Sequence, residues 1–383
     1  MELIRISPGR DLRVDFFRGL ALWWIFTDHI PGDVLSHISL QNFAMCDATE
    51  VFVLLAGYGA GLAYGVAMDR QGYLYSAADV VRRAWTLYIA HIFLFVVYTA
   101  QVAYSAAALD RSYYLDEMKL DVLGDDPYRA MLEALLLRFQ PNLLNILPLY
   151  VLLLLILAIA LPLLRSRWLL LSASFGIYAV VRATGFNLSG WAGDTWYFDP
   201  FAWQFLFIIG AVLAYGPPRM PAAKRPWDVM AVAVLLAGVV VIWVIDTHPP
   251  LLALMPAAVI RFVITEDKTG LHPFRVLSIL ALAWLVIRLV PRDARWLRSL
   301  PAAPLILAGQ NSLPVFCSGI FFGFFARLGL EYDDGAAMQV AINALGAIAM
   351  LAVAAVAAWY RGKGRGSTRA RSSLPVVAQT DTR

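Results

Sequence analysis

The chain places ionisable side chains inside an apolar segment near its start. Residues 15–31 read DFFRGLALWWIFTDHIP and contain Asp15, Arg18, Asp28 and His29. A charged group at the centre of a membrane span costs about 2.5–3.5 kcal/mol on insertion scales, so such residues usually serve a function. Arg18 and His29 are eleven residues apart. That spacing returns them to within about 20° of one helical face, about 16 Å apart along the axis. It predicts a cationic anchor and a titratable imidazole on one wall of a cavity, with Asp15 pairing with Arg18.

The next apolar segment opens with two carboxylates. Asp47 and Glu50 stand one helical turn apart at the start of residues 47–67, and we expect them near His29 at the outer end of the first span. A carboxylate beside an imidazole fixes its tautomer and raises its basicity, as in acyl-transfer dyads. The alternative is a polar helix terminus, because acidic groups near a helix N-terminus interact favourably with its dipole.

Other polar residues allow two interpretations each. His37 lies in the short segment between the first two spans and is either solvated or folded back over the site. The adjacent Arg82 and Arg83 stand at the inner end of the third span. They either set the orientation of the protein or clamp the phosphates of an anionic cofactor, which the planar donor fork of arginine suits.

A late apolar run is interrupted by Gln310, Asn311 and Ser312. This cluster is either an interhelical hydrogen-bonding group or a cavity wall. The sequence contains no HExxH, CxxC, GxSxG or P-loop pattern, and its two cysteines form no ligand cluster. We therefore expect no metal site and no nucleotide hydrolysis.

Composition places the chain in a membrane. Hydrophobic residues make up 60% of its 383 residues and charged residues 15%, against about 25% charged residues in soluble domains. The mean hydropathy is +0.67. The net charge of +4 is better explained by membrane orientation than by nucleic-acid binding. The first apolar run carries charges and lacks a small-residue cleavage pattern, so we expect a retained span rather than a signal peptide.

The apolar runs predict an all-α polytopic bundle of about ten transmembrane helices in one domain, residues 1–360, followed by a basic disordered cytoplasmic tail, residues 361–383. Cations are enriched in alternate connecting segments, which predicts that both termini are cytoplasmic and that residues 109–141 lie outside. Within that outer segment Asp126 and Pro127 predict the start of an amphipathic surface helix. Residues 251–265 are read as re-entrant or interfacial. The ten runs are 14–32, 47–67, 83–108, 142–164, 167–183, 200–216, 228–246, 272–290, 302–327 and 336–360.

Three stretches resemble a known family. RDLRVDFFRGLALWWIFTDHIP, NFAMCDATEVFVLLAGYGAG and AGQNSLPVFCSGI are similar to segments of OpgC-type membrane proteins, which are associated with succinylation of osmoregulated periplasmic glucans, and of the wider membrane acyltransferase superfamily. The superfamily's Arg, ten intervening residues and His match Arg18 and His29. Its third-span Arg-x-x-Arg pair is replaced here by adjacent arginines, and in some relatives the active histidine occupies the position matching His37.

The resemblance implies an O-acyltransferase of the bacterial inner membrane. An acyl-CoA, with succinyl-CoA expected, would bind Arg18, Arg82, Arg83, Asn311 and Ser312, and a periplasmic glucan would accept the acyl group. His29 would act as the base, oriented by Asp28, Asp47 or Glu50, with His37 as the second candidate. The rival interpretation is a transporter or flippase that uses the intramembrane charges as an ion or proton relay.

Overall fold

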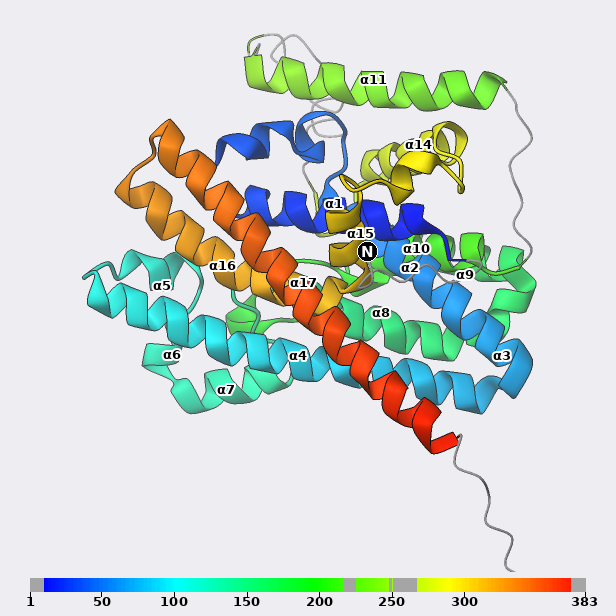
Figure 1. The fold of residues 1–383 in the computed structure, drawn as a ribbon, viewed down its shortest axis with the longest axis horizontal. Helices are drawn as coiled ribbons and strands as arrows, with labels where there is room; N and C mark the ends of the chain where they lie inside the picture. Colours follow the sequence, from blue (N-terminus) through cyan, green and yellow to red (C-terminus); the bar gives the residue numbers. More distant parts are fainter. Residues whose placement is uncertain (1–9, 217–224, 248–249, 251–266, 373–383) are drawn as a thin grey trace, which may run out of the picture.

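The computed structural model describes residues 10–216, 225–247, 250 and 267–372, and this part of the chain is helical (Figure 1). In these residues the only β pairing is an isolated bridge between Ser189 and Thr195. Among the same residues, six helical segments are long and apolar enough to cross a membrane. They are Ala48–Gln71, Tyr73–Ala108, Ile146–Thr184, Arg225–Ile245, Ser312–Tyr332 and Ala336–Lys363. The chain is thus an all-helical, multi-pass membrane protein.

The first half of the chain forms long helices separated by short turns. The principal elements are α1 (Leu12–Asp28), η1 (Val34–Ile38), η2 (Leu40–Asn42), α2 (Ala48–Ala60), the π-helical η3 (Gly61–Gly65), α3 (Val66–Gln71), α4 (Tyr73–Ala108), α5 (Tyr113–Glu117), α6 (Val122–Asp125), α7 (Pro127–Leu135), α8 (Ile146–Ala160), η4 (Leu161–Ser166) and α9 (Arg167–Thr184).

The second half continues in the same manner. Its elements are η5 (Trp191–Gly193), α10 (Pro200–Ala214), α11 (Arg225–Thr247), α14 (Pro273–Leu289), η6 (Arg295–Arg298), α15 (Ala303–Gln310), α16 (Ser312–Tyr332) and α17 (Ala336–Ser372). In Figure 1 the helix axes run across the view, with α11 along the upper edge and α4 and α7 along the lower edge.

Side-chain contacts show which helix ends lie together. The Asp69 carboxylate, at the end of α3, accepts hydrogen bonds from Arg165 in η4 at 3.3 Å and from the Tyr215 hydroxyl, just after α10, at 2.9 Å. We call this side of the bundle the Asp69 end. The α3–α4 turn lies there too, toward the right of Figure 1.

The opposite side carries His29, and we call it the His29 end. Arg275, in the first turn of α14, donates to Asp47, the residue before α2, at 2.9 Å. Gln339, in the first turn of α17, donates to the Gly32 carbonyl, just beyond α1, at 2.8 Å. Helices α1 and α2 are therefore antiparallel, as the sequence pattern predicts.

Glycines let helix backbones meet. A Cβ atom added to Gly57 or Gly61 on α2 would collide with the backbone carbonyl of Phe207 or Ala211 on α10, and one added to Gly19 on α1 would collide with that of Leu305 on α15. Small residues allow this close approach inside a bilayer, where packing rather than water expulsion holds helices together. Gly57, Gly61 and Gly65 recur every four residues in the sequence, a spacing that by itself predicts this close helix packing.

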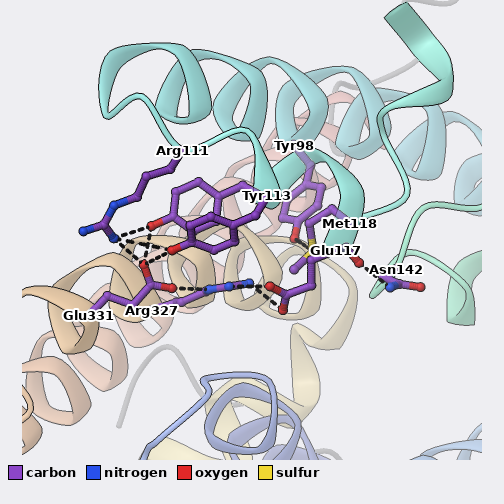
Figure 2. Close-up of polar contacts among 9 residues, drawn as sticks. Tyr98, Arg111, Tyr113, Glu117, Met118, Asn142, Arg327 and Glu331 are labelled. Atoms are coloured by element: carbon purple, nitrogen blue, oxygen red, sulfur yellow. Dashed lines mark hydrogen bonds and ion pairs between the residues drawn. The ribbon is translucent and has the colours of Figure 1, made fainter. Parts of the chain in front are cut away.

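An ionic cluster fastens the segment after α4 to α16 at the His29 end (Figure 2). Arg327 of α16 donates to Glu117 of α5 at 2.5 and 2.7 Å and to Glu331 at 2.7 Å. Glu331 also accepts from Arg111 at 2.8 Å and from the Tyr114 hydroxyl. The Arg327 side chain is only 7% exposed, so its charge is balanced by two carboxylates. The amphipathic helix predicted after Asp126 is present as α7, with Asp126 as its N-cap.

Several boundaries differ from those expected. The third-span helix α4 begins at Tyr73, so Arg82 and Arg83 lie well inside it rather than at its start. The ninth apolar run is two helices, because the chain breaks at Asn311 between α15 and α16. The last helix continues to Ser372, past the expected end at residue 360. Residues 251–265 and 373–383 lie outside the described part of the chain.

Candidate functional site

Arg18 is a partly buried cation that forms no ion pair with a carboxylate among the described residues. One of its terminal nitrogens donates to the Leu55 carbonyl of α2 at 2.9 Å. The side chain fits because Gly59 has no Cβ; one placed there would come within 3.2 Å of the guanidinium. Tyr150 of α8 and Arg83 of α4 also act on it electrostatically. The sequence expectation that this charge lies in the helix interior is met.

The expected partner of Arg18 is engaged elsewhere. Asp15 accepts from Arg10 at 2.6 and 2.8 Å and from Gln310 of α15 at 3.1 Å. The predicted Asp15–Arg18 pair is therefore wrong. Arg10 lies just before α1 and reaches the first-turn carboxylate, while Arg18 reaches an α2 carbonyl. Asp15 still acts on Arg18 electrostatically, but without a hydrogen bond between them.

His29 caps the other end of α1. It is the residue directly after the helix, and its ring Nδ1 is buried with no hydrogen-bond partner in the described structure. Lys268 and Asp47 are the charged groups that act on it electrostatically. An imidazole nitrogen without a partner is available to donate or accept a hydrogen bond, depending on the tautomer.

The two predicted carboxylates form an ionic cluster with α14. Arg275 donates through Nε to Glu50 at 2.5 Å and through a terminal nitrogen to Asp47 at 2.9 Å. Lys268 lies 2.7 Å from the same Asp47 oxygen. The remaining oxygens complete a capping box: Glu50 accepts from the Asp47 N–H at 2.8 Å, and Asp47 accepts from the Thr49 N–H at 2.7 Å.

All four carboxylate oxygens are therefore occupied by α2 and α14, and none bonds to His29. The polar helix terminus, one of the two interpretations of the sequence, describes Asp47 and Glu50 here. Lys268 and Arg275 are the cations that the sequence reasoning missed. Arg275 lies inside the predicted eighth span, so the rule that singled out Arg18 would have found it; nothing in the sequence marks Lys268.

A braced loop positions Lys268. The Lys268 carbonyl accepts from the indole N–H of Trp203 at 2.8 Å, and the Thr269 carbonyl accepts from the Asp199 N–H at 3.0 Å. The Leu271 carbonyl accepts from the Tyr178 hydroxyl at 2.7 Å. Helices α9 and α10 thus hold this loop in place. Burial opposes the charge on Lys268, but the Asp47 carboxylate outweighs that effect and raises the pKa of the lysine.

Two further candidate residues, Asp28 and His37, lie at the end of α1 and in the segment after it. Asp28 accepts from Gln41 at 3.2 Å, so it contacts the segment between α1 and α2. Asp47 and Lys268 also act electrostatically on Asp28. His37 is exposed on η1, and its ring Nδ1 lies 3.2 Å from the Val34 carbonyl. Of the two histidines, His29 is the one beside the buried charges.

Arg82 and Arg83 differ in their surroundings although they are adjacent. Arg82 pairs with Asp79 at 2.9 Å on an exposed face, its side chain 78% exposed. Arg83 is also exposed, but it acts electrostatically on Arg18 and on Tyr64. Of the two arginines, Arg83 is therefore the one that acts electrostatically on Arg18.

Asn311 and Ser312 lie where α15 meets α16. Asn311 is 1% exposed; it donates to the Leu307 carbonyl at 2.7 Å and accepts from Arg361 of α17. Ser312 is the first residue of α16. With Gln310 bonded to Asp15, this group is an interhelical hydrogen-bonding cluster, one of the two interpretations that the sequence allowed.

Comparison with known proteins places this arrangement in a family. No curated protein and no solved structure matches the chain. A family model described as OpgC protein matches residues 10–362, a range that includes every residue discussed above. The chain therefore belongs to the OpgC protein family.

Proposed function

We propose that this protein is a membrane O-acyltransferase that moves an acyl group from acyl-CoA to a sugar hydroxyl. One observation carries the proposal. Helix α1 holds a partly buried guanidinium at Arg18, which hydrogen-bonds to a backbone carbonyl and to no carboxylate, and α1 is followed by His29, whose Nδ1 is buried without a partner in the described structure. An anion site and a free base on one helix suit a thioester donor that carries phosphates at one end and reacts at the other. Family membership supports the same class of reaction.

The donor would enter from the Asp69 end. Its phosphates would meet Arg83 first and then Arg18. Arg82 would contribute less to binding, because its guanidinium is paired with Asp79. The guanidinium of Arg18 offers several N–H donors in a planar fork, of which one bonds to Leu55, and such forks match phosphate oxygens. The pantetheine arm would then extend along α1 and bring the thioester beside His29, about 16 Å from Arg18 along the helix axis.

His29 would act as the general base. It takes the proton of the acceptor hydroxyl while the hydroxyl oxygen attacks the thioester carbonyl. The carbon–sulfur bond breaks, and the protonated imidazole returns the proton to the leaving CoA thiolate. In the alternative route, the imidazole first takes the acyl group from CoA and then passes it to the hydroxyl, with the same overall transfer of the acyl group and proton. Lys268 and Arg275 keep Asp47 and Glu50 neutralised, so that neither carboxylate competes for the proton.

The resemblance to OpgC-type proteins supports succinyl-CoA as the donor and a periplasmic glucan as the acceptor, in the bacterial inner membrane. We propose ten passes with both termini cytoplasmic. The contacts at the Asp69 and His29 ends support this alternation, since α3, η4 and α10 meet at one end and α2, α14 and α17 begin at the other.

Binding of succinyl-CoA to the detergent-purified protein tests the donor site. Losing hydrogen bonds to a charged group costs about 1.5–3 kcal/mol, so Arg18→Met should weaken binding about 10- to 100-fold. Arg83→Gln should weaken it more than Arg82→Gln. Arg288→Met is the matched control, because Arg288 of α14 pairs with Asp228 of α11 and not with a residue of α1 or α2. Equal affinity in Arg18→Met and the wild type would overturn the donor assignment.

Mass spectrometry of periplasmic glucans tests the reaction itself. Cells that carry the gene should contain acylated glucans, whose mass increment identifies the acyl group. Cells without the gene should lack them. Identical glucans in both kinds of cell would reject the glucan as the acceptor. The binding of succinyl-CoA would still be tested by the experiment above.

A further inference from the structure

An apolar groove runs along the outer surface of α16 and α17 toward the C-terminal end of α17. It has a volume of about 490 Å³ and is lined by Pro314, Ala352, Val353, Val356, Ala357 and Tyr360. None of these residues belongs to the site around Arg18 and His29. The groove requires its own explanation.

The sequence explains why the groove exists. Its α17 residues are two adjacent pairs four positions apart, followed by Tyr360, and therefore share one helical face. Two of them are alanines, which leave the space that larger side chains would fill. On the other side the chain breaks at Asn311, and Pro314 lies in the first turn of α16. Residues 352–360 span about 12 Å along α17, most of one leaflet of a hydrocarbon core about 30 Å thick.

A fixed cation stands at one end of the groove. Arg361 follows the lining residue Tyr360 and lies one turn beyond Ala357. Its guanidinium is held by the Gln310 carbonyl, at 3.1 Å, and by the Asn311 side chain.

The neighbouring side chains are those of a membrane interface. Trp359 and Tyr360 are exposed, and the Lys363 ammonium lies 4.0 Å from the centre of the Trp359 ring. Tryptophan, tyrosine and lysine gather at the headgroup level of a bilayer. The groove thus lies at acyl-chain depth, with its cation at headgroup depth.

We propose that this groove binds an anionic phospholipid, with one acyl chain along α17 and the headgroup phosphate at Arg361. An apolar channel of one-leaflet length that ends in a basic group has the shape and the charge order of such a lipid, and basic pockets between helices bind anionic headgroups. A helix from a second copy of the chain would fill the apolar part but would bring no anion to Arg361. The proposal is independent of the acyl-transfer reaction.

Native mass spectrometry of the full-length protein with added phosphatidylglycerol or phosphatidylcholine tests this proposal. Phosphatidylglycerol should bind with the higher affinity. A cation near the membrane surface contributes about 1 kcal/mol toward anionic lipid, so Arg361→Gln should weaken phosphatidylglycerol binding about five-fold and Arg361→Lys should largely retain it. Ala357→Trp fills the groove and should weaken binding of both lipids. Ile348→Trp, on an exposed position of α17 that does not line the groove, is the matched control.

Two results would overturn the proposal. If Ala357→Trp binds phosphatidylglycerol as the wild type does, the groove is not the site. If both lipids bind equally and Arg361→Gln changes neither affinity, the headgroup assignment fails. The Ala357→Trp arm keeps the test informative should the Arg361 variants disturb the contact with Asn311.

Discussion

At the scale of single residues, polar groups that lack hydrogen-bond partners are costly in an apolar interior and therefore point to function. Among the described residues, Arg18 makes one hydrogen bond, to a backbone carbonyl, and the buried Nδ1 of His29 makes none. Leaving such groups unsatisfied costs about 1–3 kcal/mol each, and more for a charge. Asp47 and Glu50, by contrast, are fully bonded by Lys268 and Arg275. Groups that a fold leaves unsatisfied are those that a substrate can engage.

The histidine prediction follows from this contrast. His29→Ala should reduce acyl transfer about 10²- to 10⁴-fold, the usual contribution of a general base. His37→Ala should retain most activity, because His37 is exposed and contacts only the Val34 carbonyl in its own turn. The measurement is acylated glucan formed per unit of membrane-inserted protein. An inactive His37→Ala variant beside an active His29→Ala variant would move the chemistry to the loop histidine.

The ionic cluster at α2 and α14 gives a stability prediction. The Arg275 side chain is 11% exposed and Glu50 is fully buried. Removing one partner of a buried pair costs about 3–5 kcal/mol because the other charge is left uncompensated. Arg275→Met should therefore lower the thermal unfolding midpoint in detergent markedly. The double variant Glu50→Gln/Arg275→Met should recover part of that loss, and a double variant less stable than Arg275→Met would contradict this explanation.

At the scale of elements, close backbone contacts between helices fix the position of the site. Helix α1 meets α15 at Gly19, and α2 meets α10 at Gly57 and Gly61. These contacts set the distance from α1, which carries Arg18, to α15. They also set the distance from α2, which carries Glu50, to α10. A shift of α2 away from α10 would carry the Leu55 carbonyl and the space beside Gly59 with it.

A matched pair of glycines tests this packing. Gly57→Ala places a Cβ against the Phe207 carbonyl, whereas Gly176→Ala on α9 meets no atom within 4 Å. Gly57→Ala should lower the yield of folded protein and its unfolding midpoint. Gly176→Ala should leave both unchanged or slightly raised, since alanine favours the helix by about 0.5–1 kcal/mol. Equal behaviour of the two variants would show that the α2–α10 contact relaxes freely.

At the scale of the whole molecule, the arrangement of helix ends predicts a topology. Cysteines placed at Ser112, after α4, and at Gly362, near the end of α17, are both at exposed positions. In a background lacking Cys46 and Cys317, the Ser112 site should react with a membrane-impermeant thiol reagent applied to the periplasm. The Gly362 site should react only after the membrane is opened. Periplasmic labelling at Gly362 would reject ten passes with cytoplasmic termini.

The sequence by itself determined the helical membrane class, the OpgC resemblance, the antiparallel first two spans and the tight glycine packing. Each depends on local pattern: hydropathy, spacing, capping residues and the absence of a Cβ. The same local signals predicted the start of α7 at Asp126 and the capping role open to Asp47 and Glu50.

Only the tertiary structure decided which charges meet. Asp15 bonds to Arg10 rather than to its helical neighbour Arg18, because Arg10 reaches back to it from just before α1. Asp47 and Glu50 are bonded by Arg275 and Lys268, more than two hundred residues away in the chain. Helical periodicity fixes the face of a side chain, whereas its partner depends on which helices pack together, and that depends on all the helices at once.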